Sequence, residues 1–309
     1  MTTSRSAAAD PEVRRSGLGG SDCAVVFGLN PYRTPFQLYL EKVGEVPPAD
    51  LSDNEAVYWG TALEDLVAQR YAERMEVRVR RNNRTLRHQH YPFMMAHLDR
   101  EVVGQDVILE CKTAGEYMSG QWGEEFTSQV PPHYLLQCLH YLVVTGKPEC
   151  HLAVLIGGNK HRIYVIKACD FVQEITMIPI TLERFWQRVI DRDPPGATNA
   201  DDLALMFPTH REEVVQASQQ VLDVIAELRD VRASLKALGQ REKDLKFDVA
   251  NTLGAASTLA EGDTILATYR GQVRTSIDQK LLRAKWPDVA EQCEKKTTTR
   301  TLLLKGEKD

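Results

Sequence analysis

The segment DVILECKTA, residues 106–114, decides the fold, because it joins a buried strand to a pair of charges. Its apolar start is typical of a strand in the core of a sheet. Successive side chains of a strand point to opposite faces, so Glu110 and Lys112 share one face. The segment therefore predicts an acid and a base held side by side, although a surface ion pair is the simpler interpretation.

A second acid, Asp99, ends the preceding predicted strand, and Gly104 marks the turn between the two strands. The resulting hairpin would bring the Asp99 carboxylate close to Glu110, with the backbone carbonyl of Cys111 at the edge of the same pocket. Carboxylate and carbonyl oxygens suit a hard cation such as Mg2+. Such an ion would stabilise the charge on a phosphodiester during cleavage, and Lys112 would orient or deprotonate a water.

Three further candidate residues also have local explanations. Glu64 completes a capping-box pattern with Thr61 in the helical segment WGTALEDLVAQRYAERM, residues 59–75, in which the glutamate would bond to the N-cap amide. Gln137 and Tyr141 lie one turn apart on a predicted helix, where packing and a surface hydrogen bond would account for both. The spacing alone leaves open whether these side chains serve the site.

Two basic features are candidates for contact with a polyanion. Ser21 follows a glycine pair, and Ser21 or Asp22 is the predicted N-cap of a short helix, where Ser21 would bind phosphate together with Arg14 or simply cap the helix. The arginine-rich segment at residues 78–87, which includes Arg81, would follow a DNA backbone or form a solvated charged strand. The tail from 264 to 309, which carries more basic than acidic residues, is a second candidate DNA contact.

The remaining pattern predicts strands, helices and three regions. Residues 1–13 are expected to be a disordered lead-in, 14–200 a single large domain, and 201–309 an accessory region of amphipathic helices followed by a small α/β tail. Other expected elements are strands over residues 77–87 and 91–99, a helix over 131–146, a strand hairpin across Gly157 and Gly158, and helices over 171–193 and 211–253.

Composition limits the class of protein. The chain has 309 residues, of which 43% are hydrophobic, enough for one large core and a smaller appended unit. A net charge of -5 means that only local basic patches would attract a polyanion. Six cysteines without a C-x-x-C pair argue against a zinc knuckle. No signal-peptide pattern or membrane-length apolar run is present, so we expect a cytoplasmic protein.

Four elements taken together resemble the YqaJ-like viral recombinases of the lambda-exonuclease family, over about residues 14 to 170. They are GLGGSDCAVVFGLNPYRTPFQLYLEKVGE (residues 17–45), WGTALED, the hairpin from Asp99 to Glu110-Cys111-Lys112, and the pair Gln137-x-x-x-Tyr141. The resemblance implies the α/β fold of the PD-(D/E)XK nucleases, which is a central mixed sheet flanked by helices with the active site on adjacent strands.

The resemblance also implies residue roles. Asp99 and Glu110 would bind the metal, Lys112 would be the catalytic lysine, Glu64 would complete the metal site from its helix, and Gln137 would lie beside it. The expected cofactor is Mg2+, with Mn2+ as a substitute. The family often has a small or hydroxyl residue two positions before the aspartate and a glycine directly after it, whereas this chain has His97 and Arg100.

Substrate and partners are expectations from the same resemblance. Ser21 and Arg14 would hold a terminal 5′-phosphate, with Tyr141 and Arg81 as further DNA contacts, in an exonuclease that degrades linear duplex DNA from 5′ to 3′. Family members act in phage recombination with a single-strand annealing protein and can form a homotrimer, which suggests a phage or prophage protein in a bacterial host. The six cysteines do not supply an iron–sulfur cluster.

Two alternatives stay open. A structure-specific or site-specific endonuclease would use the same core and chemistry with different access to the groove. A non-cleaving DNA-binding recombination mediator would keep the fold alone, although the intact Asp99, Glu110 and Lys112 argue against it.

Overall fold

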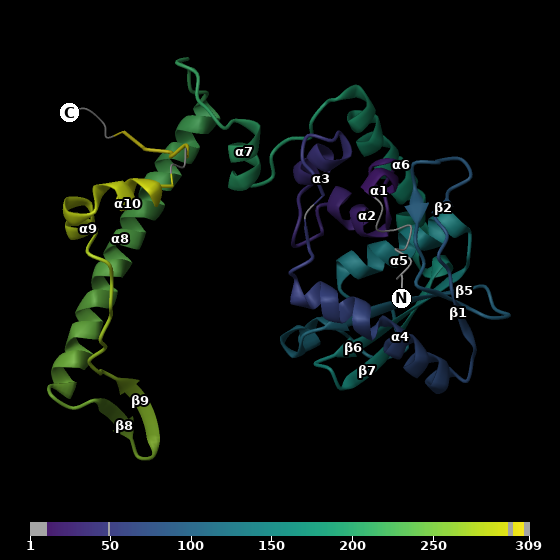
Figure 1. The fold of residues 1–309 in the computed structure, drawn as a ribbon, viewed down its shortest axis with the longest axis horizontal. Helices are drawn as coiled ribbons and strands as arrows, with labels where there is room; N and C mark the ends of the chain where they lie inside the picture. Colours follow the sequence, from purple (N-terminus) through teal and green to yellow (C-terminus); the bar gives the residue numbers. More distant parts are fainter. Residues whose placement is uncertain (1–10, 49, 296–298, 306–309) are drawn as a thin grey trace. The chain divides into compact units, whose positions relative to one another are not determined.

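The computed structural model describes residues 11–48, 50–295 and 299–305. Its contacts divide the chain into two compact units, Met1–Met206 and Phe207–Asp309 (Figure 1). Residues 1–10 of the expected lead-in lie outside the described residues, whereas residues 11–13 belong to the short helix α1 (Pro11–Arg15).

A five-stranded mixed sheet forms the centre of the first unit, with the strand order β1-β4-β5-β6-β7. Strand β5 pairs antiparallel with β4 and parallel with β6, and the outer pairs are antiparallel. The expected α/β class with a central mixed sheet flanked by helices is therefore confirmed. The strands are β1 (Val79–Arg81), β4 (Arg100–Val102), β5 (Val107–Ala114), β6 (Glu149–Ile156) and β7 (Lys160–Lys167).

The alternation of side chains on β5 divides the core of this unit into two layers. Ile108 packs in a large apolar cluster with helices α2 (Gly20–Val26), α5 (Pro132–Thr145) and α6 (Val172–Asp191). Leu109 points the other way, into a smaller cluster with Val67 and Tyr71 of α4 (Glu55–Met75). Glu110 has the same parity as Ile108 and therefore faces α5, at the polar end of the strand.

The strands before β5 are shorter than the sequence predicted. Strand β2 (Leu86–Arg87) pairs with β3 (Met95–Ala96) in a separate two-stranded sheet, so neither predicted strand, 77–87 or 91–99, is continuous. Asp99 does not end a strand but directly precedes β4. The hairpin at Gly104, whose φ is 81°, joins β4 to β5 as expected.

Helix α4 begins earlier than the capping-box pattern predicted. Asn54 is its N-cap, and the Asn54 side chain accepts a hydrogen bond from the Val57 amide at 3.2 Å. Thr61 lies inside the helix, where its hydroxyl donates to the Val57 carbonyl at 3.0 Å. The predicted capping box between Thr61 and Glu64 is therefore wrong, and the Glu64 carboxylate has other partners.

Three other predicted elements are confirmed. The segment at 131–146 forms α5, which ends at Gly146 with a φ of 69°. Strands β6 and β7 form the hairpin across Gly157 and Gly158. Helix α6 occupies the predicted segment at 171–193, and the short helix α3 (Pro35–Lys42) follows α2.

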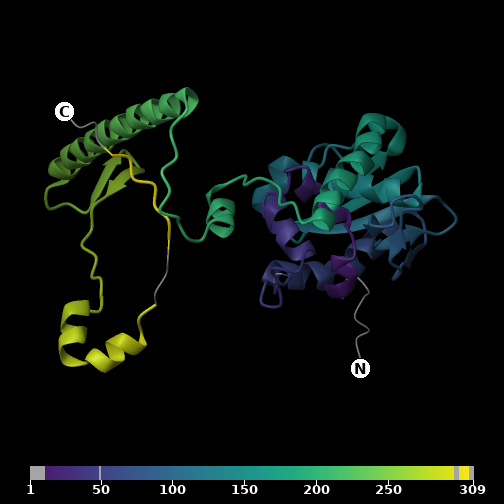
Figure 2. The ribbon, with the colours of Figure 1, turned by 90° about the horizontal axis from the view of Figure 1, so that it is seen from above.

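The second unit is built on α8 (Gln219–Leu253), one long helix that begins eight residues after the start of the predicted 211–253 segment. A hairpin of β8 (Thr258–Glu261) and β9 (Thr264–Thr268) lies beside its C-terminal end, and the helices α9 (Gln279–Lys285) and α10 (Pro287–Gln292) follow (Figure 2). Of the side chains of α8, Leu253 alone is buried.

Candidate active site

The centre of the candidate site is the carboxylate of Glu110, which is 2% exposed. Its Oε1 accepts hydrogen bonds from Lys112 Nζ and from Gln137 Nε2 of α5, both at 2.6 Å. Its Oε2 is buried without a hydrogen-bond partner. The structure thus brings together the acid and the base predicted on one strand face and adds the glutamine predicted on the neighbouring helix.

Asp99 lies against this group from the adjacent strand segment. Its Oδ2 accepts a hydrogen bond from the Cys111 amide at 2.8 Å, which anchors the carboxylate beside the strand that carries Glu110. After burial, the charge of Asp99 is the main cause of the raised pKa of Glu110. The hairpin thus brings Asp99 next to the strand that carries Glu110, and a shared role for the two acids stays a prediction.

Burial and charge change the acidity of both members of the pair. Burial and the neighbouring charge of Asp99 raise the pKa of Glu110 to about 8, against the lowering effect of Lys112. Burial lowers the pKa of Lys112, but the charges of Glu110 and Asp99 outweigh it and the net pKa is raised. Two adjacent acids with one unpartnered buried oxygen form an electron-rich group that a cation would stabilise.

Asp99 and Lys112, the neighbours of Glu110, open onto a groove of about 770 Å³. Glu64, Asp99, Cys111 and Lys112 line this groove together. Aromatic side chains line it as well: Tyr134 lies under Lys112 Nζ, with 5.4 Å to the ring centroid, and Tyr32 and Tyr117 are exposed. The groove is therefore lined by both polar groups and flat apolar rings.

Glu64 lines the groove but is held by a different partner. Its Oε1 accepts a hydrogen bond from Arg100 Nη1 at 2.7 Å, and Arg81 Nη2 lies 3.6 Å away. Among the described residues, no group of three or more His, Cys, Asp and Glu side chains lies close enough to hold a metal ion. The metal-binding role of Glu64 therefore stays a prediction, as do those of Asp99, Glu110 and Cys111.

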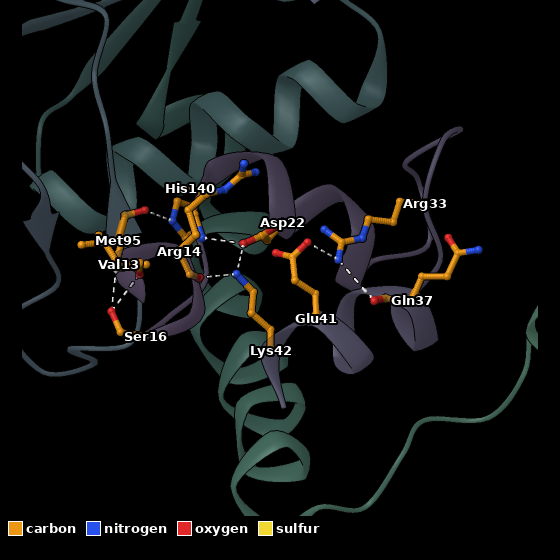
Figure 3. A network of polar contacts seen from close by, with 11 residues as sticks. Val13, Arg14, Ser16, Asp22, Arg33, Gln37, Glu41, Lys42, Met95 and His140 are labelled. Atoms are coloured by element: carbon orange, nitrogen blue, oxygen red, sulfur yellow. Dashed lines mark hydrogen bonds and ion pairs between the residues drawn. The ribbon is translucent and has the colours of Figure 1, made fainter. Parts of the chain in front are cut away.

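The predicted phosphate-binding segment is fixed by a buried lysine (Figure 3). Lys42 Nζ donates to the backbone carbonyl of Arg14 at 2.7 Å and to Asp22 Oδ2 at 2.8 Å, which ties α1, α2 and α3 together. Ser21 is exposed in the first turn of α2. The prediction that Ser21 or Asp22 caps this helix is wrong, because the helix starts at Gly20 and its N-cap is Gly19.

The second glycine of the pair before Ser21 has a packing reason. A Cβ atom on Gly20 would lie 2.5 Å from the ring of Tyr141 and 2.9 Å from Cγ of Gln137, so only glycine permits this approach of α2 to α5. Tyr141 is buried and its hydroxyl accepts a hydrogen bond from Gln137 Nε2 at 3.0 Å. Tyr141 therefore supports Gln137, and its predicted contact with DNA stays a prediction.

Arg81 and Arg100 lie opposite each other on strands β1 and β4. Arg81 was predicted to contact DNA; its guanidinium is half exposed and pairs with Asp65 at 2.9 Å. Arg100 was noticed only as a departure from the usual glycine, yet it contacts Glu64 directly. The aromatic residues of the groove were missed, because isolated tyrosines at distant positions form no sequence pattern.

Comparisons with known proteins agree with the sequence motifs. Residues 11–148 match the model of the YqaJ-like viral recombinase domain. The uncharacterized protein YqaJ of Bacillus subtilis is 33% identical over 303 residues, which cover 94% of this chain and 92% of that protein. The match thus includes the second unit.

Solved structures that match part of this chain include two exonucleases. An alkaline exonuclease from Laribacter hongkongensis is 15% identical, with a TM-score of 0.46, over 59% of this chain and 93% of that chain. A phage-related exonuclease from Haemophilus somnus is 10% identical, with a TM-score of 0.43, over 57% of this chain and 96% of that chain. No helix among the described residues is long and apolar enough to cross a membrane. On its motifs and its extended match to YqaJ, the chain belongs to the YqaJ-like viral recombinase family.

Proposed function

We propose that this protein is a Mg2+-dependent exonuclease that degrades linear duplex DNA from 5′ to 3′, starting at a 5′-phosphorylated end. The observation that carries the proposal is the group of Asp99, Glu110 and Lys112 beside an open groove. Burying Glu110 against a second acid and a lysine is costly, and a perturbed acid of this kind beside a groove is typical of catalytic sites.

The donor set fits a hard divalent ion. Asp99, Glu110 and the backbone carbonyl of Cys111 would hold it, and the unpartnered Oε2 of Glu110 supplies an oxygen that has no other use among the described residues. Glu64 would add a further carboxylate from α4. When bound, the ion supplies charge stabilisation for the cleaved phosphodiester and acidifies a water.

The chain's own residues orient the reacting groups. Gln137 and Lys112 both bond to the same Glu110 oxygen, which leaves the other carboxylate oxygen unoccupied by protein donors. The Lys112 side chain is 21% exposed and lines the groove, so Nζ can donate to a phosphate oxygen or orient the attacking water. Gln137 fixes the carboxylate so that its geometry does not change when substrate binds.

The groove suits a nucleic-acid strand that has left the duplex. Exposed Tyr32 and Tyr117 offer ring faces on which bases stack, and stacking of this kind is sequence-tolerant. Ser21 and Arg14 would bind the terminal phosphate. Degradation of one strand would leave a 3′ overhang. This overhang is the substrate of the expected partner, a single-strand annealing protein. A ring-shaped homotrimer would increase processivity.

The test uses linear duplexes with 5′-phosphate, 5′-hydroxyl or blocked ends, together with closed circular DNA, incubated with the full chain and Mg2+. The proposal predicts progressive loss of the 5′-phosphorylated strand from linear DNA and no cleavage of circles. Lys112→Ala should abolish cleavage, and Ser21→Ala with Arg14→Ala should remove the preference for a phosphorylated end.

Other outcomes identify the alternatives. Cleavage of circles would replace the exonuclease with an endonuclease on the same site. Binding of DNA without cleavage in Mg2+ or Mn2+ would contradict a catalytic role and favour a recombination mediator.

A further inference from the structure

Arg100 is a buried cation at the edge of the groove. Its side chain is 5% exposed, and Nη1 donates both to Glu64 Oε1 at 2.7 Å and to the backbone carbonyl of Asp99 at 2.5 Å. Nη2 bonds to Asp65. One guanidinium thus connects the helix acid Glu64 with the backbone of an acid of the catalytic group.

This guanidinium keeps its charge. Burial lowers the pKa of Arg100, but the hydrogen bond and the charge of Glu64 outweigh it, so the net pKa is raised. Arginine is also the side chain least able to lose its proton. The site therefore contains a permanent positive charge in direct contact with Glu64, at the position that follows Asp99 in the chain.

A divalent cation and Arg100 compete for the carboxylate of Glu64. The Arg100 bond takes its Oε1, and Arg81 lies 3.6 Å from the same oxygen. A divalent ion that recruits Glu64 would share this carboxylate with two cations, and it must also approach a like charge. Glu110 also pairs with a cation, Lys112, but through Oε1, so its Oε2 keeps no hydrogen-bond partner, and the Asp99 carboxylate accepts from the uncharged Cys111 amide.

We propose that Arg100 is a positioning residue that holds Glu64 and lowers the affinity of the site for a divalent cation by competing for the Glu64 carboxylate. This inference rests on the proposed function, since it concerns the same site. It assigns to Arg100 a role in setting the ion concentration at which the protein becomes active.

The test measures Mn2+ binding to the full chain by calorimetry without DNA, so that binding is read separately from cleavage. Arg100→Gln keeps a hydrogen-bond donor and removes the charge, and we expect it to bind Mn2+ about tenfold more tightly than the wild type. Arg100→Lys keeps the charge and should stay within about twofold of the wild type. Arg100→Met is the neutral variant to use if Arg100→Gln does not fold.

A double-mutant cycle separates competition for Glu64 from a general electrostatic effect. In a Glu64→Gln background the neutral Arg100 substitution should gain about threefold or less, because the carboxylate for which Arg100 competes is absent. The matched control is Asp65→Asn, which removes another acid bonded to Arg100; in this background the gain should stay near tenfold.

The outcomes are distinguishable. Two results would overturn the role of Arg100 and leave the proposed function intact. The first is that the wild type and the neutral Arg100 variant bind Mn2+ with equal affinity. The second is that the gain in Mn2+ affinity is equal with and without the Glu64 carboxylate. Absence of Mn2+ binding by both the wild type and the neutral variant would overturn both. A tenfold gain that depends on Glu64 supports the competition.

Discussion

The two units of the chain differ in the burial of their charged side chains. In Met1–Met206 charged side chains such as Lys42, Arg100 and Glu110 are almost fully buried, and each has an ionic partner. In Phe207–Asp309 the buried residues among those described are Leu253 and Ala290, and the charged side chains of α8 are exposed except for the half-buried Arg229.

Charged residues such as Lys42 in the first unit form specific buried ion pairs, whereas those on the exposed face of α8 mainly keep the helix soluble. Removing one partner of a buried pair leaves an uncompensated charge, whereas an exposed side chain remains hydrated whatever happens to its neighbour. Substitutions in the first unit should therefore have large and specific effects, and those on the exposed face of α8 should have small ones.

The largest effect is expected on DNA cleavage at Glu110, the most buried acid of the site. Glu110→Gln keeps the size of the side chain but removes its charge, and we expect the rate of DNA cleavage to fall by about 10³-fold or more. The measurement is the initial rate of digestion of linear duplex DNA. Glu101→Gln, on the neighbouring strand β4, is the matched control and should retain activity within about threefold; equal loss in both variants would contradict the assignment.

The second-largest effect is expected on stability, at Lys42, which holds the segment that carries Arg14 and Ser21. Lys42→Met leaves Asp22 buried without its ionic partner, and we expect the free energy of unfolding to fall by about 3 kcal/mol. Urea denaturation followed by circular dichroism measures it. The control is Lys246→Met on α8, whose ion pair with Glu242 is exposed; a loss as large as that of Lys42→Met would show that burial does not distinguish the two units.

The third effect is a pH dependence of stability. His140 of α5 is fully buried, and burial lowers its pKa to about 4. The unfolded chain takes up the proton first, so the contribution of His140 to stability is complete above pH 6.5 and is lost as the pH falls toward 4, by about 3 kcal/mol. Comparing His140→Gln with the wild type between pH 7 and 4 should show a shallower loss in the variant; parallel curves would refute the assignment.

The smallest effect is expected on α8. Leu235 is 63% exposed, and Leu235→Ser should change the free energy of unfolding by about 0.5 kcal/mol or less. Chemical denaturation of the full chain provides the measurement. A loss above about 2 kcal/mol would mean that this face is buried in solution and that the contrast between the units is smaller than the structure indicates.

The sequence predicted the part of the site that depends on local periodicity. Strand alternation placed Glu110 and Lys112 on one face, and the helix at 131–146 correctly positioned Gln137 one turn before Tyr141. These relations depend only on the geometry of a single strand or helix, which sequence spacing determines.

The errors arose where distant segments compete with local patterns. Thr61 and Glu64 matched a capping box, but Asn54 starts the helix almost two turns earlier, and Arg100 binds the glutamate instead. The two acids bonded to Arg100 lie 36 and 35 positions away in the chain, so no local pattern shows them. The same limit applies to Lys42, whose contact with Arg14 exists only after three helices have packed together.

The most direct test of the central claim compares two lysines of similar exposure. The side chains of Lys112 and Lys147 are 21% and 20% exposed, and each lies near a glutamate, but only Lys112 lines the groove beside Asp99 and Glu110. We would measure Mg2+-dependent digestion of linear duplex DNA by Lys112→Met and Lys147→Met, with DNA binding measured in parallel. The account predicts that Lys112→Met binds DNA without cleaving it while Lys147→Met cleaves at close to the wild-type rate; full cleavage by Lys112→Met would contradict it.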